Sequence, residues 1–155
     1  MNDEISGQLD SMDATRKSII QIIQDLSKEE LNWNPLPGEA NSIYSIVAHL
    51  CTSEQGMLHG TVGGLDVQRL VEEPLSSSGD DPKPIIKMIE DVGLQTREIL
   101  EALPENKLAE KIERGGRRPR SAREWIHLHI RHMSDHLGHI ELTKQFCQAG
   151  IVEKK

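Results

Sequence analysis

Apolar residues recur at spacings of three and four along much of this chain, which is the pattern of a helix packed on one side. The first such stretch runs from Asp3 to about Asp25. The second begins at Asn41 and Ser42, whose short polar side chains favour a helix N-terminus, and runs to about His59. The sequence therefore predicts two amphipathic helices in its N-terminal part.

Two further helices are predicted in the C-terminal part. The third begins near Pro82 or Pro84, because proline is tolerated in a first turn, and stops at Pro104. The fourth runs from Ser121 to Cys147 and starts with an S-x-x-E capping box. Since no strand pattern or internal repeat competes with these helices, we predict an all-α four-helix bundle formed by a single domain, residues 1–155.

The connecting stretches are rich in Gly, Pro, Ser and Asp, which interrupt helices. Residues 26–42 hold Trp33, which we expect to anchor an ordered connection. Residues 60–81 form a longer connection, in which Leu65 to Val71 suits a short helical turn. Links of this length permit a crossover, and periodicity alone does not choose between a crossover and strict up-and-down order.

Charge and composition narrow the range of partners. Acidic residues outnumber basic ones by 25 to 18, and the net charge of -7 does not favour binding to nucleic acid or to an anionic membrane. We find no signal-peptide pattern and no apolar run near the roughly 20 residues that a membrane span needs. Cys51 and Cys147 form no CxxC pattern, so no disulfide framework or zinc ribbon is indicated. These features predict a cytoplasmic protein.

One basic cluster precedes the last helix. It consists of Arg114, Arg117, Arg118, Arg120 and Arg123. Glycines and a proline lie among these arginines, so the cluster indicates either a solvated loop or a clamp for an anion such as a substrate carboxylate.

Histidine is the main chemical signal, because five of the seven histidines lie on the last predicted helix. At about 100° per residue, one inward face carries four of them together with Trp125, whereas His127 points away. The four are His129, His132, His136 and His139. Several imidazoles on one buried face pack poorly and repel when charged, and a bound metal ion removes this conflict.

His132 and His136 lie one helical turn apart, so both can reach a single ion. The third ligand is predicted to be His49, at the border of the apolar face of the second helix. His59 suits the role less, because it falls near the polar side and the end of that helix. Three neutral histidines with an open position are typical of a catalytic metal site. Nitrogen ligands alone do not identify the ion.

Glu54 lies in the middle of the apolar stripe of the second helix. A carboxylate there requires a partner, either the N–H of a ligating histidine or a water on the metal. We therefore consider Glu54 a candidate catalytic residue that orients a ligand or moves protons.

Two segments resemble the DinB/YfiT-like superfamily of metal-dependent enzymes. WNPLPGEANSIYSIVAHLCTSE is similar to the family's Trp-Pro-Gly entry into a helix with a first histidine, and HMSDHLGHIEL to its closing H-x-x-x-H-x-G-Q-I motif. The resemblance covers nearly the whole chain and places the family's metal triad on His49, His132 and His136. His139 stands where the family commonly has Gln, so it either competes for the metal or occupies the rim of the site.

The resemblance also implies an up-down-down-up bundle, often a homodimer, with a divalent ion such as Zn, Ni or Fe. Characterised relatives include S-transferases and isomerases that use low-molecular-weight thiols. Our leading hypothesis is a metal-dependent transferase or hydrolase, in which a metal-activated thiol or water attacks an electrophilic small molecule. The alternative is a non-catalytic metal-binding or dimeric interaction protein linked to stress responses, and a metal-free bundle with core histidines is a third possibility.

Overall fold

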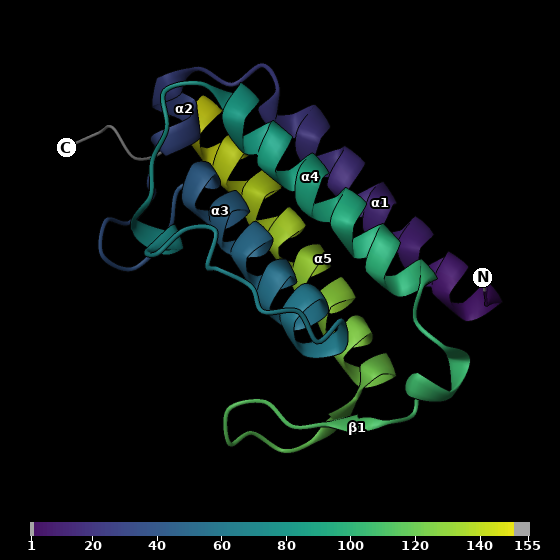
Figure 1. Ribbon diagram of the computed structural model, residues 1–155. Coiled ribbons are helices and arrows are strands. Elements are labelled where there is room, and N and C mark those ends of the chain that lie inside the picture. Colours follow the sequence, from purple (N-terminus) through teal and green to yellow (C-terminus); the bar gives the residue numbers. More distant parts are fainter. Residues whose placement is uncertain (1, 151–155) are drawn as a thin grey trace.

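The computed structural model describes residues 2–150, in which four long helices lie side by side (Figure 1). They are α1 (Asp3–Ile23), α3 (Ile43–Glu54), α4 (Pro82–Glu101) and α5 (Ala122–Gln148). Each begins directly after a side chain that accepts a hydrogen bond from a first-turn backbone N–H, namely Asn2, Ser42, Asp81 and Ser121. The predicted four-helix bundle is confirmed, and so is the capping box at Ser121.

The directions of the helices follow from the contacts between them. α1 and α5 are parallel, because Glu4 pairs with Arg123 near their starts and Lys144 reaches the carbonyl of Ile22 near their ends. α4 runs antiparallel to α1, since Asp13 contacts Arg97 whereas Arg16, further along α1, contacts Ile89. α3 is parallel to α4, because Tyr44 near its start lies against Gly79 just before α4, whereas Glu54 at its end accepts a hydrogen bond from Thr96, further along α4. The order is therefore up-down-down-up, as the family resemblance implied.

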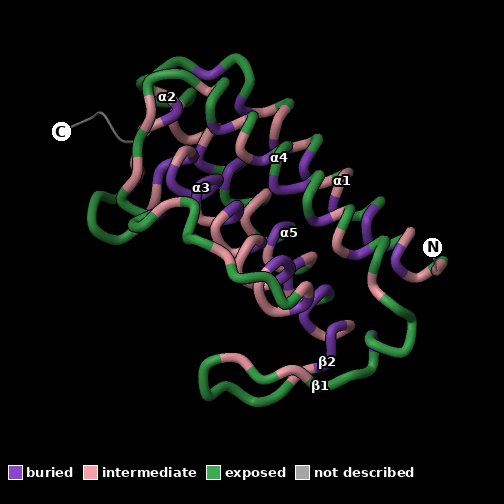
Figure 2. The backbone as a smooth tube through the Cα atoms, viewed as in Figure 1, coloured by how far each residue is buried: buried purple, intermediate pink, exposed green. Residues whose placement is uncertain are grey.

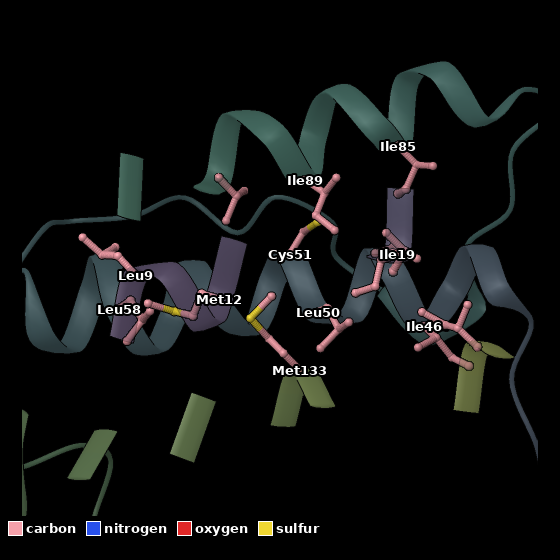
Figure 3. Packing of buried hydrophobic residues seen from close by; sticks show 14 of the residues in the cluster. Leu9, Met12, Ile19, Ile46, Leu50, Cys51, Leu58, Ile85, Ile89 and Met133 are labelled. Carbon is pink, nitrogen blue, oxygen red and sulfur yellow. The ribbon is translucent and has the colours of Figure 1, made fainter. Parts of the chain in front are cut away.

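One apolar cluster joins the four helices. Figure 3 shows Leu9 and Met12 of α1, Ile46 and Leu50 of α3, Ile85 and Ile89 of α4, and Met133 of α5 within it. Figure 2 shows the buried residues along the inward sides of the helices, whereas exposed residues dominate the connections. None of the helices described is long and apolar enough to cross a membrane.

The connection between α1 and α3 contains a short helix, α2 (Lys28–Asn32), which begins with a capping box formed by Ser27 and Glu30. The side chain of Trp33 is half-buried. Asn32 joins this connection to the link before α4, because its amide donates to the carbonyl of Gly79 at 2.7 Å and accepts from the N–H of Gly79 at 3.1 Å. Asn32 thus links the two long connections.

Because α3 and α4 are parallel, the link between them returns along the outside of α3 (Figure 1). The predicted helical turn at Leu65 to Val71 is wrong, and the only turn of helix in residues 64–81 is the 3-10 helix η2 (Pro74–Ser76). Leu65 and Leu70 are 43% and 40% exposed, so burial of these two side chains does not stabilise a helix there.

A small hairpin precedes α5. The strands β1 (Lys111–Ile112) and β2 (Arg120–Ser121) pair antiparallel, and Gly115 and Gly116 in the loop between them have φ values of 52° and 71°. Two-residue strands are too short for a polar–apolar alternation, so they could not be predicted from the sequence. The hairpin places the arginine-rich loop beside the start of α5. A further 3-10 turn, η3 (Glu105–Lys107), leads into β1.

Candidate metal centre

His49 of α3 and His132 and His136 of α5 come together as predicted. The Nε2 atom of His132 lies 3.1 Å from Nε2 of His49 and 3.0 Å from Nε2 of His136. One ligand atom of each ring lies within 4.8 Å of those of the other two. His132 and His136 share a direction because four residues span about one helical turn. The three rings therefore meet at one place between α3 and α5.

Core packing beside the rings sets their positions. Leu50 follows His49 in α3 and Met133 follows His132 in α5, and both apolar side chains are buried. Figure 3 shows Leu50 and Met133 between these two helices. Since the histidines project from helices held by the same core, their convergence does not depend on a loop.

The three rings are half-buried, which favours their neutral form. Burial, with the like charges of neighbouring histidines, lowers the pKa of His132 and His136 to about 4. Burial also lowers the pKa of His49, and the charge of Arg69 adds to this effect. A neutral imidazole is the form that binds a metal ion, so the site is ready for a cation near neutral pH.

The other histidines of α5 take separate positions. His127 is exposed, as predicted. His129 is fully buried, and its Nε2 lies 3.2 Å from Oε2 of Glu54. His139 is exposed, unlike the inward position expected from the helix face, and its Nδ1 lies 3.3 Å from Nδ1 of His136. It lies at the rim, beside the ring nitrogen of His136 that faces away from the cluster.

Glu54 is buried and its carboxylate has three partners. Oε1 accepts hydrogen bonds of 2.6 Å from Nη2 of Arg16 and Oγ1 of Thr96, and Oε2 faces His129. Burial alone raises the pKa of Glu54, but the charges of His129 and Arg16 and the hydrogen bonds outweigh it and lower this pKa well below its usual range. The catalytic role of Glu54 stays a prediction, since these contacts tie α3 to α1, α4 and α5.

The expectation that His59 lies near the polar side of its helix is wrong. His59 is fully buried, and its Nε2 lies 2.9 Å from Oγ1 of Thr96. After Glu54 the α-helix continues as a π-helix, η1 (Gln55–Val62), whose wider turns rotate the following residues away from the 3.6-residue repeat. Glycines at 56, 60 and 63 were the available signal that the regular helix is interrupted here.

A cavity of about 350 Å³ borders His49 on the side toward the end of α3. Its lining includes Thr52, Gln55, Arg69 and Arg114. Of the five arginines predicted as a solvated loop or an anion clamp, Arg114 lines this cavity, whereas Arg118 and Arg123 pair with glutamates. Arg69 could not be predicted as a lining residue from the sequence, because it lies in the irregular link before α4.

A second cavity, of about 330 Å³, borders His136 and His139 on the side toward the start of α3. Its lining includes the apolar side chains of Ile46, Leu142 and Phe146. The histidine cluster thus lies between one cavity with two arginines and another that is largely apolar.

Comparisons with known proteins agree with this fold. The family model described as the DinB superfamily matches residues 11–140. A DinB-like protein from Bacillus cereus ATCC 10987 has a TM-score of 0.75 at 22% identity, covering 94% of this chain and 92% of that one. A conserved protein from Enterococcus faecalis has a TM-score of 0.72 at 12% identity, covering 90% of this chain and 94% of that one.

A third similar structure is YfiT from Bacillus subtilis, described as a probable metal-dependent hydrolase with an unusual four-helix bundle topology. Its TM-score is 0.73 at 10% identity, covering 96% of this chain and 90% of that one. At these identities the three structures show a shared fold. No curated protein matches the chain.

Proposed function

The chain belongs to the DinB superfamily, and we propose that it is a metal-dependent enzyme in which His49, His132 and His136 hold a divalent ion. The observation that carries the proposal is the convergence of these three neutral rings between α3 and α5. A divalent ion bound by three histidines supplies a Lewis acid, which lowers the pKa of a water or thiol at its open position.

The donor set fits such an ion. At metal–nitrogen distances of about 2.0 to 2.1 Å, neighbouring ligand atoms lie about 3.0 to 3.4 Å apart. The Nε2 separations of 3.1 Å and 3.0 Å around His132 agree with this range. The Nε2 atom of His132 carries either one proton or one lone pair, so only one of its two short contacts can be an ordinary hydrogen bond, whereas a cation accepts the lone pairs of all three nitrogens. Zn, Ni and Fe each suit imidazole ligands.

Transfer of a low-molecular-weight thiol to an electrophilic small molecule is the reaction we favour. The thiol loses its proton to solvent, its sulfur bonds to the electrophilic carbon, and the leaving group departs with the electron pair of the broken bond. Two cavities of similar size reach the histidine cluster from opposite ends of α3, which suits a reaction between two substrates. His49 borders one cavity and His136 the other, so each reactant would lie next to a proposed ligand of the ion.

Hydrolysis is the second candidate, supported by the description of YfiT from Bacillus subtilis as a probable metal-dependent hydrolase. Water then replaces the thiol as nucleophile, and a single substrate occupies the cavities. The two reactions differ in whether turnover requires a thiol.

Elemental analysis of protein purified without a histidine tag tests the metal, and turnover of a panel of electrophiles with and without small thiols tests the reaction. We expect about one divalent ion per chain, lost in His132→Ala and kept in His127→Ala, which alters an exposed histidine of the same helix. Thiol-dependent product would support transfer and thiol-independent product hydrolysis. A metal-loaded protein that turns over no substrate in the panel would favour a non-catalytic metal-binding protein, and a parent protein without metal would refute the proposal.

A further inference from the structure

We propose that the cavity beside His49 binds an anionic group of a small-molecule substrate through the guanidinium groups of Arg69 and Arg114. The inference rests on the proposed function, since it names the substrate class of the same site. The group is a carboxylate or a phosphoryl group, because both accept paired hydrogen bonds from guanidinium.

The charge of this cavity is opposite in sign to the net charge of the protein. The chain carries a net charge of -7, yet the cavity lining holds two arginines and no aspartate or glutamate. Its volume of about 350 Å³ lies within the range of small-molecule sites. Both cations line the same cavity, so an anion held there would be attracted to each of them.

Neither arginine is neutralised by a carboxylate in residues 2–150. Arg16, Arg97, Arg118 and Arg123 all form ion pairs there, and Arg69 and Arg114 form none. Arg69 donates from Nε to the carbonyl of Val71 at 3.1 Å, which leaves its terminal nitrogens for a ligand. Burial, together with the charge of Arg117, lowers the pKa of Arg114, as expected for a cation that has lost water without gaining a counter-charge.

The surrounding structure holds the guanidinium group of Arg114 and the backbone beside the exposed Arg69 in place. The N–H of Leu70 donates to Oε1 of Gln55 at 3.2 Å, which fixes the link beside Arg69 to the π-helix. The guanidinium of Arg114 lies over the ring of Trp125, 5.6 Å from the ring centroid. It also lies against Gly56, where a Cβ atom would be 2.7 Å from Nη2. Sites positioned before binding lose less entropy when a ligand arrives.

The position of the cavity decides how a substrate would lie. His49 belongs both to the cavity lining and to the histidine cluster. An anionic group between Arg69 and Arg114 therefore places the rest of a small molecule toward the three rings. We expect substrates with a carboxylate or phosphoryl group a few bonds from the reacting atom, and we expect cationic analogues to be excluded.

Titrations of metal-free protein followed by NMR test the site. The probes are acetate and inorganic phosphate, with acetamide as the neutral control, and the signals are the arginine Nε–H groups and the amides of Gly56 and Leu70. We expect both anions, and not acetamide, to shift these signals. Arg69→Gln and Arg114→Gln should each weaken anion binding by about tenfold, as the loss of a charged hydrogen bond predicts. The tighter of the two anions identifies the preferred chemistry.

Arg117→Gln is the matched control, because Arg117 is exposed in the same loop and is absent from the cavity lining. It should change anion affinity less than about twofold. Arg114→Lys keeps the charge but loses the planar guanidinium, so its anion affinity should lie between that of the parent and that of Arg114→Gln. Circular dichroism of each variant verifies that it is folded.

Unchanged anion affinity in Arg69→Gln and Arg114→Gln would overturn the proposal, and so would an equal loss in Arg117→Gln. The anion could also bind only to metal-loaded protein, with an affinity that neither substitution changes. That result would mean that the anion binds the metal ion, and it would also overturn the proposal. Because the titration uses metal-free protein, its failure is separate from failure of the metal site. Conversely, a chain that binds no metal still gives a clear result here.

Discussion

In the proposed metal site, protons and metal ions would compete for the same nitrogens of His132 and His136. Their pKa values of about 4 in the folded protein lie below the ordinary histidine value of 6.5, so the unfolded chain takes up protons first. The stability of the metal-free protein is therefore greatest above pH 6.5 and falls as the pH drops from 6.5 toward about 4. Below that range these two groups add no further pH dependence.

Urea denaturation of the metal-free protein across this pH range measures the effect. The double variant His132→Gln, His136→Gln should show a smaller loss of stability than the parent, because two proton-binding groups are gone. Some loss should remain, since the pKa of His49 and that of His59 are also lowered by burial. An identical pH dependence in parent and variant would contradict the prediction.

Glu54→Gln separates a structural from a catalytic role of this residue. The substitution removes the buried counter-charge of Arg16 and leaves only its ion pair with the half-exposed Asp13, so we expect a loss of about 3 kcal/mol in the free energy of unfolding. Metal content should remain that of the parent, because the carboxylate contacts Arg16, Thr96 and His129 instead of the clustered rings.

The exposed ion pair between Lys87 and Asp91 provides the control for Glu54. Asp91→Asn removes a carboxylate from a solvent-exposed pair and should cost less than about 1 kcal/mol in unfolding free energy. If Glu54→Gln instead kept parental stability and lost turnover at full metal content, the carboxylate would have to be assigned to the chemistry.

The positions of the clustered histidines could be predicted from the sequence. The positions of His132 and His136 follow from a spacing of four, and His49 follows from its place at an apolar border. The partners of Glu54 could not be derived in this way. Arg16 and Thr96 lie on other helices, and their approach to Glu54 depends on how those helices are rotated about their axes, which one sequence does not specify.

Among the elements, α5 bears most directly on the site because it carries two of the three clustered histidines. Its start is fixed by a reciprocal cap, in which Ser121 Oγ accepts from the N–H of Glu124 at 3.2 Å and Glu124 accepts from the N–H of Ser121 at 2.7 Å.

Ser121→Ala should lower the free energy of unfolding by about 1 kcal/mol, measured by urea denaturation. Ser11→Ala, at an exposed position inside α1, should stay within about 0.5 kcal/mol of the parent, and an equal cost at both positions would refute the cap's role.

Elements also differ in how readily the sequence predicts them. The four long helices were predictable because each has caps and an apolar face of several turns. The π-helix Gln55–Val62 was not, since the count of 3.6 residues per turn holds only while the hydrogen-bond pattern is constant. The two-residue strands were also not predictable. Tertiary contacts and the glycine turn produce them, and they show no local alternation of polar and apolar residues.

For the whole molecule, the order of the helices explains where the site lies. Parallel α3 and α4 require a link that travels back along the bundle, and this link brings Arg69 beside His49. The hairpin before α5 brings Arg114 to the same cavity. Segments that looked like spacers in the sequence thus form the walls of the cavity, and their contribution depends on the topology.

The bundle should fold without metal and gain stability when metal is added. Its apolar cluster draws on all four long helices and does not include the three histidines, so chelation should leave the far-ultraviolet circular dichroism largely unchanged. A ligand that binds only the folded state stabilises it by about 2.7 kcal/mol when its free concentration is about 100 times Kd. For a chain of this size that corresponds to a rise in Tm of roughly 5 to 10 °C.

Thermal unfolding with increasing Zn, for tag-free protein first treated with a chelator, measures this rise. In the variant His49→Ala, His132→Ala, His136→Ala the rise should vanish while helicity stays close to that of the parent. His127→Ala should retain the full rise, because that ring is exposed on the opposite side of α5. An equal rise in the triple variant would mean that the ion binds elsewhere, and loss of helicity on chelation would mean that the metal, more than the apolar core, holds the four helices together.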